Sequence, residues 1–542
     1  MERPVITVNE GKLQGTTLKS VLGVHYFAFK GIPFAQPPIG PLRFKGPQPP
    51  LKWSGIRDAS KHAGDVCVQY ESNGPQPYKI FGGEDCLYLN VYTNAMECNR
   101  PVMIFVHGGG FIEDTGNDSV YSHEYLVSKN IVLVTVNYRL GPMGFLSLGN
   151  EEAAGNQGLR DVLMALKWVN RNIEAFGGDP KNVTLFGNSA GSMITHIFTL
   201  IPATRGLIHK AILQSGNAIN SKNLIHGKGI TNGFRIASLL GFKSDDPIKV
   251  VEFLRSLPAE KLVELQTRIY SKQSSEGIDP YGPIYDAHYS KDPVIPAPLG
   301  QLLKNDAHIP VIIGHTKNES LLFLMGQYND ETYKYYDQNI ESIVKNALPL
   351  KDPSVFPEIM KEIRSFYLKN KPINKDTVWN LINLLSDINM VNGTRKIVDL
   401  RNDHAHASTY VYTFSYMGNE PTIYQFDKGP QPLKGVAHAD ELSYMFYLTY
   451  MREEGEKYQN QYPREGTKDR LVMERLLQMW YNFAISGNPT PTLDGKIITT
   501  AWLPSRKETL HYLDIGEKLI LRSDKDSETR ALYEKISRNL IF

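Results

Sequence analysis

The chain has 542 residues, of which 41% are hydrophobic and 21% are charged. Its 59 basic and 57 acidic residues leave a formal net charge of +2, which argues against nucleic acid or an acidic lipid surface as the main partner, because proteins that bind these usually carry a concentrated basic excess. Three cysteines in a chain of this length exclude a disulfide scaffold. The first residues lack an apolar core of secretory length, and no stretch reaches the roughly 18 apolar residues of a membrane span, so we expect a cytoplasmic protein without a membrane span.

Strands are predicted from residue 87 onward. Before that point, residues 31–41 and 48–50 are rich in glycine and proline and are expected to form irregular surface chain. Residues 87–92 alternate between polar and apolar, as a strand does, and residues 102–106 and 131–136 are continuous apolar runs, which is typical of strands that are buried on both faces.

From residue 158 onward, predicted helices alternate with predicted strands. Apolar residues form one stripe over residues 158–176, which predicts a helix that ends at Gly177-Gly-Asp-Pro180. Further strands are expected at 183–186, 211–213, 311–313 and 409–414, and a closing helix at 471–485. This alternation predicts an α/β fold with a large, mostly parallel central sheet and helices on both faces.

A serine follows the predicted strand 183–186, within Gly187-Asn-Ser-Ala-Gly191. This Gly-x-Ser-x-Gly pattern lies between a strand and a helix-compatible run, which is the context in which it marks a nucleophile. A sharp turn strains the backbone of Ser189 and lifts its hydroxyl above the sheet edge, while side chains at 187 and 191 would collide. Ser189 is therefore the candidate nucleophile. The alternative is a serine that merely caps a helix between two glycines.

A run of glycines, His107-Gly-Gly-Gly-Phe111, comes directly after the strand 102–106. Consecutive glycines let backbone N–H groups converge on one point, as a negative charge developing on a carbonyl oxygen requires. Gly109 and Gly110 would supply two donors and Ala190, next to the serine, a third. The alternative is a flexible glycine hinge.

An activated serine needs a base, and the base needs an acid that orients it. In a fold with this nucleophile turn the chain order is serine, acid, histidine. Glu319 lies just after the strand 311–313. The histidines downstream of it are His404, His406, His438 and His511. His438 lies in a loop that enters a helix, but the residues alone leave all four open.

Several segments, in one order, resemble type-B carboxylesterases of the cholinesterase and esterase family, most closely the insect α-esterases. They include Phe29-Lys-Gly-Ile-Pro-Phe-Ala, Glu84-Asp-Cys-Leu-Tyr-Leu-Asn-Val, residues 107–111, 137–145 and 155–180, the serine turn, and Gly435-Val-Ala-His-Ala-Asp-Glu. The resemblance implies an α/β-hydrolase fold in which residues 1–542 form a single domain with long insertions. It also implies roles for the candidate residues: Ser189 as nucleophile, Glu319 as acid, His438 as base, and Gly109, Gly110 and Ala190 as oxyanion hole.

The activity that the resemblance implies is hydrolysis of neutral carboxylic esters through an acyl-enzyme, in detoxification or in the metabolism of lipid or xenobiotic esters. Small-molecule esters are the expected partners, and neither a cofactor nor a metal is expected. The alternative is slow-turnover sequestration of organophosphates or other reactive esters by the same nucleophile. A catalytically inactive interaction domain of the same fold is disfavoured by the intact set of candidate residues.

Two ion pairs are also implied by the resemblance, Arg43 with Glu84 and Arg139 with Asp179. Cys67 and Cys86 fall where secreted relatives form a disulfide. Because we expect no signal peptide, we expect these cysteines to be reduced.

The chain departs from the family pattern at several places. Asn188 stands before the nucleophile where the family usually has glutamate, and Asn318-Glu319-Ser320 replaces the usual Asp-Glu-Gly. Lys222 stands where the α-esterases carry an acyl-pocket tryptophan. The stretch between Cys67 and Cys86, where choline esterases hold their substrate's cation on a tryptophan, contains Tyr70, Tyr78 and Phe81 but no tryptophan. The absence of this ring and of the glutamate predicts neutral substrates.

Overall fold

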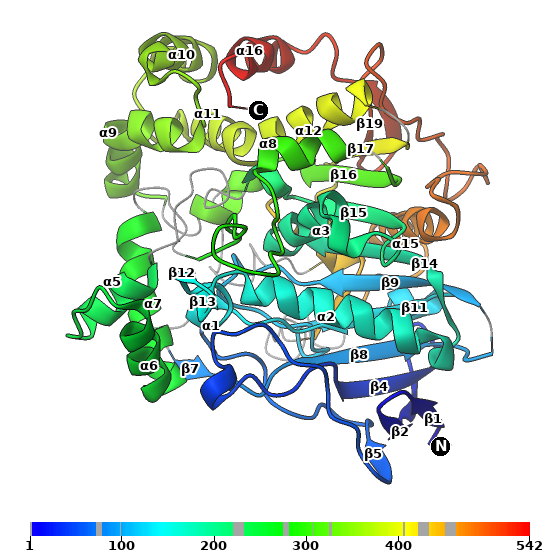
Figure 1. Ribbon diagram of the computed structural model, residues 1–542. Helices are drawn as coiled ribbons and strands as arrows, with labels where there is room; N and C mark the ends of the chain where they lie inside the picture. The colour runs from blue at the N-terminus through cyan, green and yellow to red at the C-terminus, as the bar shows by residue number, and fades with distance from the viewer. Residues whose placement is uncertain are drawn as a thin grey trace.

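An 11-stranded sheet forms the centre of the computed structural model (Figure 1), which describes residues 3–71, 79–97, 99–220, 232–274, 281–306, 308–324, 328–404, 407–420, 433–449 and 462–541. The strand order is β20-β19-β17-β16-β15-β14-β9-β11-β8-β4-β3. In that order the strands span Leu519–Ser523, His511–Ile515, Thr409–Phe414, Val311–Thr316, Lys210–Gln214, Gly178–Asn188, Arg100–Val106, Val132–Val136, Tyr88–Thr93, His25–Pro33 and Thr16–Lys19.

The middle of this sheet is parallel and its margins are antiparallel. Every neighbouring pair from β11 to β19 is parallel, whereas β8, β4 and β3 on one side and β20 on the other are antiparallel to their neighbours. The expected α/β-hydrolase architecture, a large and mostly parallel sheet, is confirmed.

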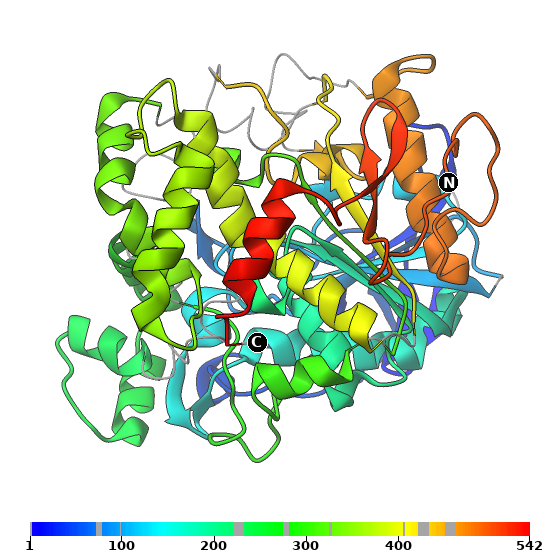
Figure 2. The same ribbon diagram turned by 90° about the horizontal axis from the view of Figure 1, so that it is seen from above.

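Alternate side chains of the central strands enter two different cores. In β9, Val102, Ile104 and Val106 pack into one core, while Met103 and Phe105 pack into the other. The first core is closed by α2 (Gln157–Asn172), α3 (Ala190–Leu200) and α12 (Asn392–Asp403), and the second by α15 (Lys468–Ser486). Figure 2 shows α15, in orange, across the sheet from these other helices. Burial on both faces is the reason that these strands read as continuous apolar runs.

Long insertions separate the later strands of the sheet. Between β15 and β16 lie α5 (Asn232–Leu239), α6 (Pro247–Ser256), α7 (Ala259–Ser274) and α8 (Leu299–Leu302). Between β16 and β17 lie α9 (Asp330–Ala347), α10 (Phe356–Ile363), α11 (Val378–Ser386) and α12. The α9–α11 group has a hydrophobic cluster of its own, which also takes in residues of the C-terminal helix α16 (Glu528–Ser537).

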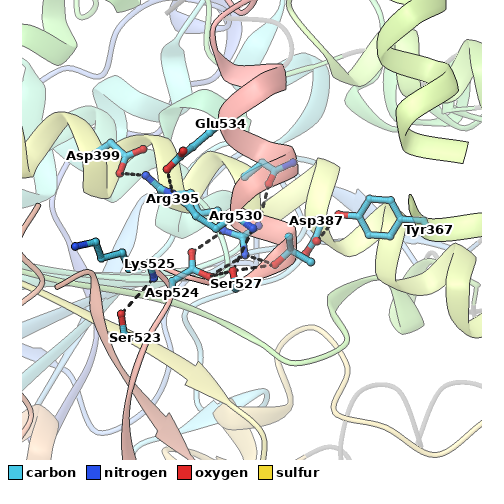
Figure 3. Close-up of polar contacts among 12 residues, drawn as sticks. Tyr367, Asp387, Arg395, Asp399, Ser523, Asp524, Lys525, Ser527, Arg530 and Glu534 are labelled. Atoms are coloured by element: carbon cyan, nitrogen blue, oxygen red, sulfur yellow. Dashed lines mark hydrogen bonds and ion pairs between the residues drawn. The ribbon is translucent and has the colours of Figure 1, made fainter. Parts of the chain in front are cut away.

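Partly buried ion pairs attach α16 and the turn before it to α12 (Figure 3). The guanidinium of Arg395 on α12 donates from Nε and Nη2 to the two carboxylate oxygens of Asp524, at 2.8 and 3.1 Å. Arg530 on α16 donates to Asp399 on α12 at 2.8 Å and to Glu534, one turn further along α16, at 3.0 Å. The C-terminal end of the chain is thus held by charged side chains as well as by apolar contacts.

The strands and helices predicted from residue 87 onward are confirmed, usually with longer bounds. The N-terminal prediction is wrong in part, because residues 31–33 belong to β4, and Ile32 and Phe34 are fully buried. Gly31, with φ 62°, sits where the register between β4 and β8 shifts, so this glycine marks a bulge within a strand rather than surface chain.

The described ranges contain no candidate membrane span and no candidate metal cluster. No helix within them is long and apolar enough to cross a bilayer. Within the same ranges, no three His, Cys, Asp or Glu side chains are grouped so that they could hold a metal ion.

Candidate active site

The candidate residues converge on one edge of the sheet. The glycine run follows β9, Ser189 follows β14, and Glu319 follows β16. Since these strands are parallel neighbours or near neighbours, their carboxyl ends meet at the same edge, which is where open α/β sheets bind ligands.

Ser189 occupies a strained turn between β14 and α3. Its backbone has φ 56° and ψ −124°, a conformation that costs a residue other than glycine about 1–3 kcal/mol. A Cβ on Gly191 would clash with the carbonyl oxygens of Val106 and His107, and one on Gly187 would clash with the backbone of Gly191. The two glycines are therefore required by close backbone approach, as the sequence predicts, and the half-buried Ser189 projects at the sheet edge.

The glycine loop lies directly against this serine. A Cβ added at Gly108 would be only 3.2 Å from the Cβ of Ser189. Gly109 and Gly110 follow with φ of 82° and 59°, in the left-handed region that glycine adopts without cost. Within the described part of the chain, the backbone N–H groups of Gly109, Gly110 and Ala190 donate to no protein acceptor. These donors are available to a negatively charged oxygen.

Tyr138 holds the start of the glycine loop through hydrogen bonds and ring stacking. Its hydroxyl donates to the carbonyl oxygens of His107 and Gly108, at 3.1 Å each, and its ring stacks on that of His107. Burial lowers the pKa of His107 to about 3, so this imidazole is neutral. It acts here as a flat, uncharged packing surface and not as a base.

Glu319 and His438 are hydrogen-bonded to each other. Nδ1 of His438 is bonded to Oε2 of Glu319, and both side chains are buried. The other carboxylate oxygen of Glu319 accepts from the hydroxyl of Ser215 at 2.6 Å and from the backbone N–H of Thr316 at 2.8 Å. Three donors therefore fix the orientation of this carboxylate.

The electrostatics of this pair keep the acid ionised and make the histidine a stronger base. Burial by itself would raise the pKa of Glu319, but the charge and hydrogen bond of His438 and the bond from Ser215 outweigh it, so the pKa is lowered. Burial likewise would lower the pKa of His438, but Glu319 outweighs it and the pKa is raised. The pair thus favours an imidazolium next to a carboxylate, which is what a base that accepts a serine proton needs.

Comparisons with known proteins agree with this geometry. The family model described as "Carboxylesterase family" matches residues 2–532. The chain belongs to the carboxylesterase family. It is 34% identical to the juvenile hormone esterase of Tribolium castaneum over 90% of this chain and 84% of that protein. It is 33% identical to esterase E4 of Myzus persicae over 93% of this chain and 89% of that protein.

A solved structure shows the same fold. The crystal structure of juvenile hormone esterase from Manduca sexta, with OTFP covalently attached, superposes with a TM-score of 0.84 and 28% identity, and covers 99% of this chain and 100% of that one. The relatives are named as ester hydrolases, and this protein is a carboxylesterase.

Two of the other candidate histidines of this carboxylesterase, His404 and His511, lie on elements away from the serine turn. His511 is on β19, paired with Ser523 of the edge strand β20, and His404 follows the last turn of α12. His406 lies outside the described residues. Of the four histidines that the sequence left open, His438 is the one that the structure bonds to Glu319.

Asn318 stands where the family usually has aspartate, and its contacts show why asparagine is tolerated in this carboxylesterase. Its backbone N–H donates to the carbonyl oxygen of Val436 at 2.9 Å, and its side-chain oxygen accepts from the N–H of Val436 at 3.2 Å. The loop that carries Glu319 is thereby paired with the loop that carries His438. An aspartate can accept the same bond, so asparagine here preserves the geometry.

A second buried carboxylate, Glu441, was not found from the sequence. It is fully buried in η11 (Asp440–Tyr444) and accepts bonds from Nε2 of Gln214 and the hydroxyl of Tyr412, at 3.2 Å each. Burial, followed by the charge of Glu319, raises its pKa to about 7. The only sequence signal was its position three residues after His438.

One of the two implied ion pairs is confirmed and the other is wrong. Arg43 donates to Glu84 from Nε at 2.6 Å. Arg139, however, pairs with Asp161 of α2 through two bonds at 2.8 and 2.7 Å. Asp179 lies at the start of β14 whereas Arg139 follows the end of the parallel β11, so the two residues are at opposite edges of the sheet.

The expectation of reduced cysteines is also wrong. Cys67 and Cys86 form a disulfide, with their Cα atoms 4.9 Å apart and both residues buried. The chain between them returns through the hairpin of β6 (Gln69–Tyr70) and β7 (Ile80–Phe81) and so brings the two sulfurs together. Because disulfides persist in oxidising compartments, the bond favours such a compartment over the cytoplasmic location, which stays a prediction.

Lys222 and Tyr78 lie outside the described residues. The expectations about the acyl pocket that rest on them stay predictions.

Proposed function

We propose that this carboxylesterase hydrolyses neutral carboxylic esters through an acyl-enzyme formed on Ser189. The observation that carries the proposal is the juxtaposition, at one sheet edge, of a strained serine, a glycine loop with unused N–H groups, and a bonded Glu319–His438 pair. Together these supply a nucleophile, a site for an oxyanion and an oriented base.

The acylation half-reaction moves one proton and breaks one ester bond. His438 accepts the Ser189 proton while Oγ attacks the carbonyl carbon, and Glu319 stabilises the resulting imidazolium. The N–H groups of Gly109, Gly110 and Ala190 bind the tetrahedral oxyanion. When the intermediate collapses, the imidazolium gives its proton to the departing alcohol.

Deacylation repeats these steps with water as the nucleophile. His438 removes a proton from the water as it attacks the acyl carbonyl, and the oxyanion occupies the same three N–H groups. The proton then returns to Ser189 Oγ as the carboxylic acid leaves. The chemistry needs no group beyond the side chains and backbone named above.

Neutral esters are the proposed substrates because, within the described residues, no carboxylate adjoins the nucleophile in the chain and three of the five tryptophans are closed to a ligand. Asn188, which is buried, stands beside the nucleophile in place of a carboxylate. Trp168, Trp480 and Trp502 are fully buried in the cores, so their faces cannot receive a ligand. The names of the relatives make juvenile hormone a candidate among lipid esters, and detoxification of xenobiotic esters the other proposed role.

The test is a titration with a fluorophosphonate followed by a panel of esters, run on the wild type and on Ser189→Ala. We expect one equivalent of probe per chain and hydrolysis of p-nitrophenyl butyrate, both abolished in Ser189→Ala. Juvenile hormone belongs in the panel as a candidate lipid ester. A burst of alcohol without sustained turnover would instead indicate sequestration of reactive esters. Hydrolysis by Ser189→Ala at more than a few per cent of the wild-type rate would refute the assignment.

Charge selectivity is tested with a matched pair of substrates. Butyrylcholine and its uncharged isostere 3,3-dimethylbutyl butyrate differ in one atom. A tryptophan face that binds the cation contributes about 2 kcal/mol, or roughly thirtyfold in affinity. We expect the neutral ester to have the higher kcat/KM, and a tenfold preference for the charged ester would show a cation site.

A further inference from the structure

The side chain of Gln69 joins the disulfide loop to the oxyanion loop. Gln69 belongs to β6, two residues after Cys67, and is only 3% exposed. Its Oε1 accepts from the backbone N–H of Asp114 at 2.7 Å, and its Nε2 donates to the carbonyl oxygen of Asp114 at 3.0 Å. The same Nε2 also donates to the carbonyl oxygen of Cys67 at 2.9 Å. One amide therefore bonds both backbone groups of Asp114 and the backbone of a disulfide cysteine.

Asp114 needs such support because its backbone is strained. Its φ is 90°, which is unfavourable for a residue with a side chain and persists only where surrounding contacts impose it. The carboxylate adds two local bonds, from the hydroxyl of Tyr121 at 2.5 Å and from the N–H of Thr115 at 2.7 Å. These bonds hold the side chain, whereas Gln69 holds the peptide groups on both sides of the strained Cα.

The strained residue packs directly beneath the oxyanion loop. The N–H groups of Ile112 and Glu113 both donate to the carbonyl oxygen of Gly109, at 2.9 and 3.1 Å, so the chain turns back on itself here. A Cβ on Gly109 would be 2.9 Å from the Cβ of Asp114 and would clash with the carbonyl of Glu113. A shift of the Asp114 backbone would therefore also move Glu113, whose N–H holds the carbonyl oxygen of Gly109.

We propose that Gln69 is a positioning residue for ester hydrolysis, which clamps Asp114 so that the N–H groups of Gly109 and Gly110 are aimed at the oxyanion, and that the Cys67–Cys86 disulfide anchors this clamp. The inference rests on the proposed function, since it assigns Gln69 a role through the oxyanion loop. The amide contacts no reacting atom. Its effect is to limit the directions in which the two donors can point.

Gln69→Met tests the clamp, because methionine fills a similar volume without hydrogen bonds. Oxyanion donors act only once the carbonyl becomes tetrahedral, and an error of about 1 Å in their position costs up to a hundredfold. We expect kcat for p-nitrophenyl butyrate to fall at least tenfold with KM nearly unchanged. Gln157→Met is the matched control, since Gln157 is equally buried and its amide donates to the backbone of Phe44 at 2.5 Å. Its kcat should stay close to the wild-type value.

A trifluoromethyl ketone separates positioning from general stability. Addition of Ser189 Oγ to this carbonyl forms a hemiketal whose oxyanion occupies the N–H site, whereas the matching methyl ketone binds without bond formation. In Gln69→Met the inhibition constant of the trifluoromethyl ketone should rise by the factor lost in kcat, and that of the methyl ketone should not change. Equal weakening of both ketones, or a wild-type kcat, would overturn the proposal.

The anchor is tested by a double-mutant cycle with Cys67→Ala/Cys86→Ala. Removal of the disulfide should lower kcat without raising KM, and adding Gln69→Met should lower it little further, because both changes release the same loop. Multiplication of the two effects would show that the disulfide and the clamp are independent. Gln69→Asn, whose amide is one methylene short, replaces the methionine variant if that protein does not fold, and its kcat must also fall.

Ser189→Ala assayed in parallel distinguishes this inference from the proposed function. An active Ser189→Ala variant would refute the proposed function itself. An inactive Ser189→Ala variant together with a fully active Gln69→Met variant would refute only the clamp.

Discussion

Nδ1 of His438 is hydrogen-bonded to the carboxylate of Glu319, a residue 119 positions earlier in the chain. The bond directs the Nδ1–H towards the acid, so Nε2 is the nitrogen left to exchange protons with the nucleophile. Asn318 reinforces the arrangement, since its bonds to Val436 pair the two loops that carry the acid and the base.

The first prediction concerns the identity of the base. Replacing His438 with alanine should reduce kcat/KM by about three orders of magnitude or more, because members of a catalytic triad act as a unit. His511→Ala is the control, since His511 lies on β19 and pairs with the edge strand. The measurement is p-nitrophenyl butyrate hydrolysis with the melting temperature recorded for each variant. A severe loss in His511→Ala with unchanged stability would place the base there.

The second prediction is the pH dependence of the reaction. His438 must be neutral to accept a proton, and its pKa is raised above the ordinary value of 6.5, so kcat/KM should fall as the pH drops through a value above 6.5. In Glu319→Gln the main cause of the raised pKa is removed, while burial, which lowers the pKa, remains. The fall of kcat/KM on the acidic side of the profile, here called the acid limb, should therefore move to lower pH. The maximal rate should also fall.

Glu441→Gln serves as the comparison for this pH profile. Glu441 also raises the pKa of His438, but it is the least of the causes, so its replacement should move the limb in the same direction by less. A limb that stays in place in Glu319→Gln would mean that another group controls the profile.

The third prediction separates two neighbouring glycines. Both Gly109 and Gly110 have positive φ, so alanine is strained at either position. A Cβ at Gly109 would also clash with the carbonyl of Glu113, whereas one at Gly110 meets, among the described residues, only Cγ1 of Ile112, at 3.8 Å. We expect Gly109→Ala to lower kcat about a hundredfold and Gly110→Ala to lower it much less. The opposite order would show that the loop rearranges in a way that this geometry does not describe.

The fourth prediction counts thiols. The chain has three cysteines, and two of them are joined as Cys67–Cys86. In the unfolded but unreduced protein, one thiol per chain should therefore react with Ellman's reagent, and after reduction three thiols should react. Because the disulfide closes a loop of 19 residues, its loss should cost about 3 kcal/mol of stability. Three thiols in unreduced protein purified under oxidising conditions would contradict the bond.

The fifth prediction concerns the attachment of α16 shown in Figure 3. Arg395→Met removes both bonds to Asp524 and leaves Asp524 and the neighbouring Asp387 without the positive charge that compensates them. The pair is partly buried, with 10% of the arginine and 22% of the aspartate side chain exposed. Its loss should therefore cost more than the roughly 1 kcal/mol at most of an exposed pair and less than the about 3–5 kcal/mol of a fully buried one, as thermal or denaturant unfolding would measure.

Lys507→Met is the control for this loss. Its ion pair with Asp403 is exposed, with 73% of the lysine side chain accessible, and should have no measurable effect on unfolding. Equal effects of the two variants would mean that the Arg395 pair does not stabilise the protein.

Local patterns predicted the parts of the site that depend on a few consecutive residues. The turn at Ser189 follows from close approach of the backbone at Gly187 and Gly191, which is a steric property of the segment itself. The central strands were evident because burial on both faces demands uninterrupted apolar side chains. The bulge at Gly31 could not be predicted, because a segment rich in glycine and proline has the same composition in a surface loop and in an irregular strand.

Contacts between distant segments could not be predicted from such patterns. The residues left four histidines as candidates for the base, and only the resemblance to a family favoured His438. Arg139 pairs with Asp161 and not with Asp179, because Arg139 follows the carboxyl end of β11 whereas Asp179 lies at the opposite end of the parallel β14. The buried Glu441 is signalled only by its position three residues after His438, and the clamp of Gln69 carries no local signature.

The sequence by itself determined the sheet, the strained serine and the glycine loop, because each of these arises from backbone sterics and burial within a short stretch of chain. The tertiary structure decided which groups work together: the bond from His438 to Glu319, the disulfide between Cys67 and Cys86, and the link from Gln69 to Asp114. These depend on which strand ends lie side by side after folding. Hydrogen bonds act only over about 3 Å, so partners separated by tens of residues are chosen by the folded geometry and not by their spacing in the chain.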